Sequence, residues 1–144
     1  MALALAACGG SSAPSVPNVA QLPLVPGSTV VAQAQQCDHG ASAYCALQIV
    51  VVSRRYRTSD DLLADERARL VSLGWSRESA EVGNEHAADS PGNKLRVTYA
   101  TAFNDLTGIQ LDWIQRSRPI SLALSHALFQ RVPALSMMLE FSSG

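Results

Sequence analysis

The feature that most constrains the fold is an almost unbroken apolar run at residues 45–55, in which β-branched side chains predominate. Successive side chains of a strand point to opposite faces of a sheet, so such a run needs apolar cover on both faces. We therefore expect a central strand here, covered at least partly on each side. The chain of 144 residues, 47% of them hydrophobic, has enough material for one modest core.

A helix is predicted to follow this strand. Thr58 or Ser59 can cap its first turn, and the two aspartates after them lie where the positive end of the helix dipole favours anions. Gly74 can take the left-handed conformation that ends a helix, with Trp75 folding back as the apolar contact of the cap. The apolar stripe expected to face the core consists of Leu62, Leu63, Leu70, Val71 and Leu73.

A second helix is predicted close to the C-terminus. Ser117, Arg118 and Pro119 begin it, because proline is tolerated in the first turn of a helix, and Pro133 stops it. Its expected buried face consists of Ile120, Ala123, Leu124, Ala127 and Leu128.

Further strands are predicted at residues 28–35, 76–82, 94–103 and 134–142, with 109–113 as a possible extension and 83–93 as a polar loop. Alternation places Leu95, Val97, Tyr99, Thr101 and Phe103 on one face of their strand, and Leu135, Met137, Leu139 and Phe141 on one face of theirs.

From residue 45 onward the predicted order is strand, helix, strand, strand, helix, strand, which is the order of the ferredoxin-like plait. We therefore predict an α+β fold of this βαββαβ type with an extra N-terminal strand. Strands 45–54 and 94–103 are expected at its centre. This fold hosts binding modules, enzymes and oligomerisation domains alike, so it says little about function.

The N-terminal residues bear on location. Leu5-Ala6-Ala7-Cys8 is followed by small flexible residues, and it resembles the lipobox of bacterial lipoproteins, in which leucine and two small residues precede an invariant cysteine. The resemblance covers this segment alone. It implies cleavage before Cys8, a diacylglyceryl group on the Cys8 sulfur, and an extracytoplasmic protein anchored by lipid to a bacterial membrane. Because no Lys or Arg precedes this short apolar run, we expect residues 1–7 to be the remnant of a signal peptide. A chance Ala-Leu tail is the alternative.

A segment rich in proline, serine and glycine comes next. Residues 1–36 carry no charged side chain, and residues 8–27 include Pro14, Pro17, Pro23 and Pro26. This composition predicts a flexible, extended tether over 8–27 and a single α+β domain over 28–144.

Two cysteines remain besides Cys8. In an oxidising compartment Cys37 and Cys45 are expected to form a disulfide across a short loop. The competing interpretation is a metal site of Cys37, His39 and Cys45, but no fourth ligand follows at a spacing known for zinc. We therefore expect the disulfide and no metal.

The charge and the absence of known motifs limit the classes of partner and cofactor that the sequence indicates. The 11 basic and 12 acidic residues give a net charge of −1, so no basic excess indicates nucleic acid. No apolar run approaches the roughly 18 residues that a transmembrane helix needs. The sequence lacks a dinucleotide fingerprint, a phosphate-binding loop, a zinc-protease motif and a hydrolase nucleophile motif, so we expect no cofactor.

Five arginines form a possible anion-binding site. Arg54, Arg55 and Arg57 follow the central strand, and Arg116 and Arg118 precede the second helix. Guanidinium groups match carboxylates and phosphates, but such residues are more often solvated strand ends.

The histidines are the candidate catalytic bases. His86 follows Glu85 in the polar loop and His126 lies on the second helix beside Ser125; neither is in a nucleophile motif, so no catalytic residue is assigned. Four acids, Glu78, Glu81, Glu85 and Asp89, fall in or near the same loop, where solvation is the simpler interpretation.

These observations predict a lipid-anchored, non-catalytic binding or interaction module of the cell envelope. Its partner would be an envelope protein or a small molecule, and the sequence does not name it. One alternative is a small envelope hydrolase using His86 or His126. Another is a homo-oligomer that associates through an exposed sheet face or edge strand.

Overall fold

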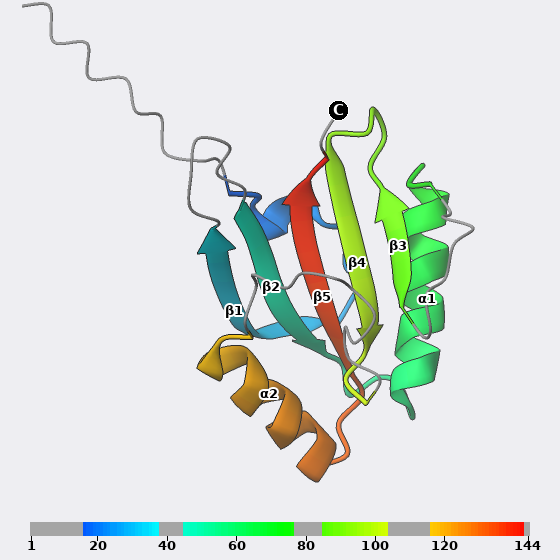
Figure 1. Cartoon of the computed structure of the whole chain (residues 1–144). Helices are drawn as coiled ribbons and strands as arrows, with labels where there is room; N and C mark the ends of the chain where they lie inside the picture. Colours follow the sequence, from blue (N-terminus) through cyan, green and yellow to red (C-terminus); the bar gives the residue numbers. More distant parts are fainter. Residues whose placement is uncertain (1–15, 38–44, 77–84, 104–115, 143–144) are drawn as a thin grey trace, which may run out of the picture.

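One antiparallel sheet with a helix on each side forms the protein (Figure 1). The computed structural model describes residues 16–37, 45–76, 85–103 and 116–142. Its strands are β1 (Thr29–Cys37), β2 (Cys45–Val52), β3 (His86–Asp89), β4 (Leu95–Thr101) and β5 (Ala134–Phe141), in the spatial order β1-β2-β5-β4-β3. The helices are α1 (Ser59–Ser72), α2 (Arg118–Phe129) and the short 3-10 helix η1 (Val19–Gln21).

The two faces of β2 contact different apolar clusters. Leu47, Ile49 and Val51 belong to the cluster beneath α1, whereas Val50 and Val52 belong to the cluster beneath α2. Helix α1 packs on β4 and β5, and α2 packs on β1 and β2, as Figure 1 shows. The strand predicted from the apolar run is therefore confirmed, and it is covered on both faces.

The α+β class is confirmed, whereas the strand order of the ferredoxin-like plait is not. Strand β5 lies between β2 and β4, with Met137 paired to both Ile49 and Tyr99, so the two strands expected at the centre are not neighbours. Alternation in β5 indicated one buried face, but Ser136 and Met138 on its other face are also buried. Serine is small and methionine is flexible, so both can pack there, although the alternating pattern placed neither of them on the buried face.

Helix α1 begins and ends where the sequence predicts. The Thr58 hydroxyl accepts a hydrogen bond of 3.1 Å from the backbone N–H of Asp61. Gly74 takes a φ of +87°, and the N–H of the buried Trp75 donates to the Leu70 carbonyl at 3.0 Å. This is the expected cap, in which a left-handed residue lets the chain fold back onto the last turn.

The inner face of α1 differs from the prediction. Leu62, Glu66 and Leu70, spaced four residues apart, are buried, whereas Val71 and Leu73 are 42% and 47% exposed. The positions four residues apart share one helix face, and the prediction passed over Glu66 because it is charged.

Part of the predicted tether packs on the sheet. Leu22 and Val25 belong to the same apolar cluster as β2, and Asn18 caps η1 through a hydrogen bond of 2.9 Å to the N–H of Ala20. Proline fixes the extended backbone of this segment while its apolar residues are buried. The folded part of the chain therefore includes residues 16–27, whereas residues 8–15 of the predicted tether lie outside the described residues.

Three smaller expectations fail. Residues 86–89, placed in a polar loop, form β3. Leu128 is 47% exposed and Phe103 is 83% exposed, because α2 turns Leu128 away from the sheet and β4 ends at Thr101.

Strand β1 is confirmed within two residues of its predicted bounds. The strands expected at 76–82 and 109–113 fall almost wholly outside the described residues.

The disulfide is confirmed. Cys37 at the end of β1 is bonded to Cys45 at the start of β2, and the two residues are register partners. Both thiols are consumed in this bond, so they are not free to hold a metal. His39, the third residue of the metal interpretation, lies outside the described residues, as does Cys8. None of the described helices reaches the length and apolarity that crossing a bilayer requires.

Candidate binding site

A groove lies between α2 and the edge strand β1. Its volume is about 700 Å³, within the range of about 300–1,000 Å³ typical of ligand pockets. Alanines form much of its floor, because Ala32 of β1 faces Ala123 and Ala127 of α2. Their methyl groups are too short to fill the space between a strand and a helix, so the space stays open.

The rim of the groove combines apolar and polar side chains. Val31 is 48% exposed and Leu122 is 57% exposed, so each wall presents an aliphatic side chain to solvent. Gln33 and Gln130 add amide groups, and Arg54 adds a positive charge. Such a lining suits a ligand that is apolar along its length and polar at a few points.

Strand β1 forms one wall and has one free edge. It pairs with β2 alone, and among residues 16–37, 45–76, 85–103 and 116–142 no strand lies on its other side. A register shift between Val30 and Ala32 marks a bulge near its start, and from Ala32 to Cys37 the pairing is regular. The strand carries no charged residue and no proline.

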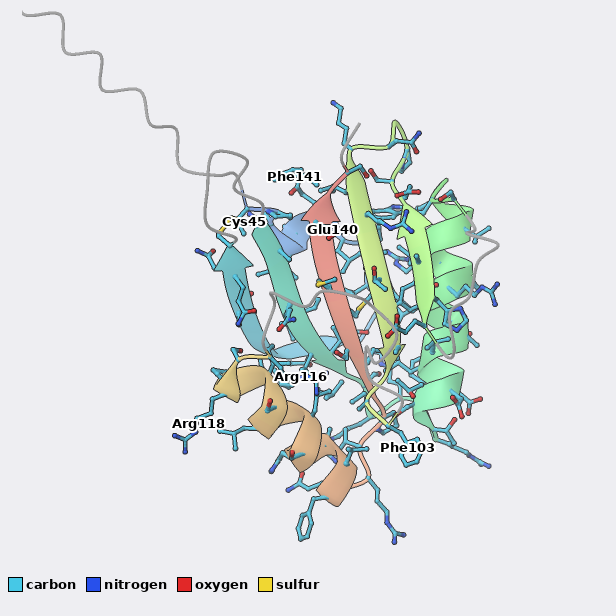
Figure 2. All side chains as sticks on the ribbon, in the orientation of Figure 1. Cys45, Phe103, Arg116, Arg118, Glu140 and Phe141 are labelled. Atoms are coloured by element: carbon cyan, nitrogen blue, oxygen red, sulfur yellow. A yellow bond between two sulfur atoms is a disulfide. The ribbon has the colours of Figure 1, made fainter. Side chains whose placement is uncertain are left out.

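The structure separates the five predicted arginines. Arg54 lines the groove, and Arg118 begins α2 beside Pro119, which also lines it. Arg55 leans instead against Gly27 of the N-terminal segment. Figure 2 shows Arg118 projecting outward from the first turn of α2, apart from Arg116. Arg57 is exposed and, like Arg118, does not line the groove, and neither Arg54 nor Arg118 forms an ion pair with another described residue.

His126 also lines the groove but lacks the partners of a catalytic base. Its side chain makes no hydrogen bond within the described part of the chain. A histidine base needs a second group that orients the ring and fixes its tautomer. The geometry at His126 therefore supports binding better than catalysis.

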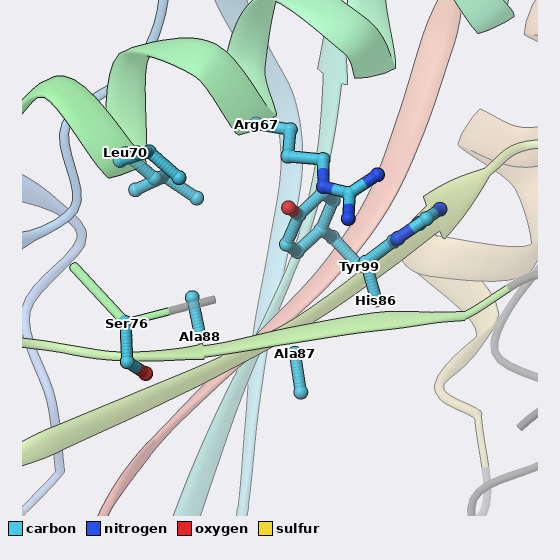
Figure 3. A pocket seen from close by; sticks show the side chains of 8 residues that line it. Arg67, Leu70, Ser76, His86, Ala87, Ala88 and Tyr99 are labelled. Atoms are coloured by element: carbon cyan, nitrogen blue, oxygen red, sulfur yellow. The ribbon is translucent and has the colours of Figure 1, made fainter. Parts of the chain in front are cut away.

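His86 lies at a second, much smaller cavity. It stacks on Tyr99 with ring centroids 5.5 Å apart, and Figure 3 shows the Arg67 side chain extending from α1 toward these two residues. The cavity of about 10 Å³ holds at most a single water molecule. Glu85 before it is buried, so this pair does not form the solvated loop that the sequence indicates. No group of metal-binding side chains gathers here or elsewhere in the described residues.

A polar row crosses the sheet on the α2 side. In register it runs Gln36, Ala46, Glu140, Arg96 and Asp89. The Arg96 guanidinium pairs with the Asp89 carboxylate at 3.3 Å, and one buried oxygen of Glu140 has no hydrogen bond. Burial raises the pKa of the Glu140 carboxyl above its usual range.

Glu66 is the most deeply buried carboxyl group among the described residues. It accepts a hydrogen bond of 2.8 Å from the N–H of Val25, while its second oxygen is buried without a partner. Burial raises its pKa to about 7, and the bond from Val25 and the charge of Arg69 oppose this shift. The contact joins the N-terminal segment to α1 and lies on the opposite face of the sheet from the groove.

Sequence reasoning missed the groove itself. Of its lining residues it singled out only Arg54 and His126 for polar chemistry and assigned Ala123 and Ala127 to the core. The available signal was the uncharged β1 segment, which lacks the lysines and prolines that commonly protect an edge strand.

No protein-family model matches this chain, and neither the comparison with curated proteins nor that with solved structures gave a match.

Proposed function

We propose that this protein is a non-catalytic binding module of the bacterial cell envelope, anchored through lipid on Cys8. The observation that supports it is the groove of about 700 Å³ between α2 and β1. The groove is large enough for a ligand, is mainly apolar, and offers no oriented catalytic group among the described residues. Its partner would be an envelope protein or a small molecule.

The disulfide supports an extracytoplasmic location. Disulfides persist in oxidising compartments, and Cys37–Cys45 joins the strand that forms the groove wall to the rest of the sheet. The lipid anchor rests on the lipobox resemblance at Cys8.

Site-specific photo-crosslinking in the source bacterium tests this function. A photoreactive phenylalanine analogue replaces Leu122 in the groove or, as a matched control, Leu128, an exposed leucine of α2 that does not line it. We expect a discrete crosslinked product from position 122 that is absent from position 128. Equal products from both positions, or none from either, would contradict a binding role for the groove.

The anchor is tested separately by the intact mass of the membrane-bound protein. We expect a mature chain that begins at Cys8 and carries added acyl mass. A chain with an unmodified Cys8 would overturn the anchoring part of the proposal.

A further inference from the structure

The edges of the sheet differ in the state of their backbone groups. At the β3 edge, Ser76 donates its N–H to the Asp89 carbonyl at 2.9 Å, and its hydroxyl accepts from the Asp89 N–H at 2.9 Å. At the β1 edge no described residue provides such cover. Every second residue of an edge strand points its N–H and C=O outward, and in β1 these outward groups have no backbone partner among the described residues.

The groove runs beside this free edge. A strand added to β1 would point alternate side chains to the α2 face, where Val31, Leu122 and the alanine floor would receive apolar groups. The backbone of the edge and the apolar lining of the groove would thus be satisfied by one extended peptide.

The charges around the groove select among peptides. Arg54 lines it, and Arg118 and Arg131 each adjoin a lining residue in the sequence. Residues 113–139 contain no acidic side chain, and β1 carries no charge. A peptide with acidic residues beside its apolar positions complements this surface.

The same charges disfavour a second copy of this chain as the occupant. Two β1 strands paired about a two-fold axis would bring no acid to either groove, because each would contribute an uncharged strand. They would also bring together two α2 helices that each begin with Arg118 and contain no acidic residue.

We propose that the groove binds an extended acidic segment of a partner protein, which adds to the free edge of β1 as a further antiparallel or parallel strand. This proposal rests on the groove being a binding site and names the chemistry of its ligand. The main chain of β1 supplies hydrogen bonds, the groove supplies apolar contact, and Arg54 in its lining supplies charge complementarity.

Peptide binding to the full chain tests the proposal, with Cys8→Ser to prevent lipidation. The probe is a fluorescent peptide of sequence EEVTVTVEE, and fluorescence anisotropy measures its affinity. One control peptide replaces every glutamate with lysine. The other keeps the parent side chains but carries N-methyl groups on alternate backbone nitrogens, in two versions that cover both registers.

We expect the glutamate peptide to bind at least tenfold more tightly than the lysine peptide. Of the two N-methylated versions, we expect at least one to lose binding, because its methyl groups block the backbone N–H groups that would pair with β1. Leu122→Glu should weaken binding at least tenfold, while Leu128→Glu, at another exposed leucine of the same helix, should not. Arg54→Glu should weaken binding of the glutamate peptide and strengthen that of the lysine peptide.

Three outcomes would overturn the proposal. If both methylated versions bind as well as the parent, the ligand does not add as a strand. If the lysine peptide binds equally, the charge argument fails. If neither peptide binds, or if the chain sediments as a dimer that excludes them, the occupant is not an acidic peptide. In each case crosslinking from position 122 still tests the groove as a binding site.

Discussion

The two edges of the sheet, β3 and β1, differ in length, in charge and in how far their outward backbone groups are covered. β3 is four residues long, it is covered by Ser76, and Asp89 pairs with Arg96 of the next strand. β1 is nine residues long, carries no charge and is uncovered within the described residues. Exposed edges invite pairing with other chains, and proteins usually shorten, charge or cover them. Within the described residues, Ser76 therefore covers the Asp89 end of β3, whereas no residue covers β1.

The largest expected effect comes from breaking the cover on β3. Trp75→Ala removes a buried indole that directly precedes Ser76, so it should lower the free energy of unfolding by about 3–5 kcal/mol. Urea unfolding measures this change. Leu73→Ala is the control, because Leu73 is 47% exposed and its loss should cost less than about 0.5 kcal/mol. Similar losses for both variants would show that Trp75 does not hold this edge.

The next effect concerns Glu66, which holds the N-terminal segment on the sheet. Its pKa is raised from 4.5 to about 7, so its contribution to stability is fully present below pH 4.5 and is lost as the pH rises through 7. Charging the buried group should cost about 3 kcal/mol over this window. Urea unfolding from pH 4 to 8 should show this fall in the native protein and a flatter profile in Glu66→Gln.

Asp60→Asn controls for the general effect of removing a carboxylate, because Asp60 is exposed on the same helix. It should leave the fall in stability between pH 4.5 and 7 unchanged. A profile as flat as that of Glu66→Gln would assign the pH dependence to the overall charge instead of to the buried site.

The disulfide is expected to have a slightly smaller effect, confined to the β1 side. Cys37 and Cys45 are separated by eight positions, and closing so short a loop stabilises the folded state by about 2.5 kcal/mol in the chain-entropy model. The double variant Cys37→Ser, Cys45→Ser should lower the free energy of unfolding by about this amount. An added reductant should destabilise the native protein and leave the double variant unchanged.

The smallest effect is expected at the ion pair on β3. Asp89→Asn should cost about 0.2–1 kcal/mol, because the side chains of Asp89 and Arg96 are 21% and 32% exposed and water screens the pair. The cost should shrink further in 1 M salt, which urea unfolding at two ionic strengths would show. A salt-independent cost above 2 kcal/mol would mean that Asp89 supports this edge by other means.

The sequence predicted the local features of the fold but not the long-range order of its strands. The apolar run of β2 and the caps of α1 are local signals, because each depends on residues near one another in the chain, and both are confirmed. The position of β5 between β2 and β4 depends on pairings across the whole chain, which no local pattern encodes.

The groove could not be predicted either, because it also depends on residues that are far apart in the sequence. It exists because α2 and β1, far apart in sequence, present alanines to each other. The burial of Glu66 was hidden by its charge, since its partner is the backbone of Val25, which has no sequence signature. Only the absence of charge in residues 1–36 hinted that β1 is unlike an ordinary edge strand.

Hydrogen exchange of individual backbone amides, followed by NMR on the full chain with Cys8→Ser, tests the central claim most directly. For the free protein we predict alternation along β1, with inward amides protected and outward amides exchanging fast, while the Asp89 amide bound to Ser76 stays protected. Saturation with the EEVTVTVEE peptide should slow the outward β1 amides and leave Asp89 unchanged. Uniform protection along β1 in the free protein, or outward amides that the saturating peptide leaves fast, would contradict an available edge.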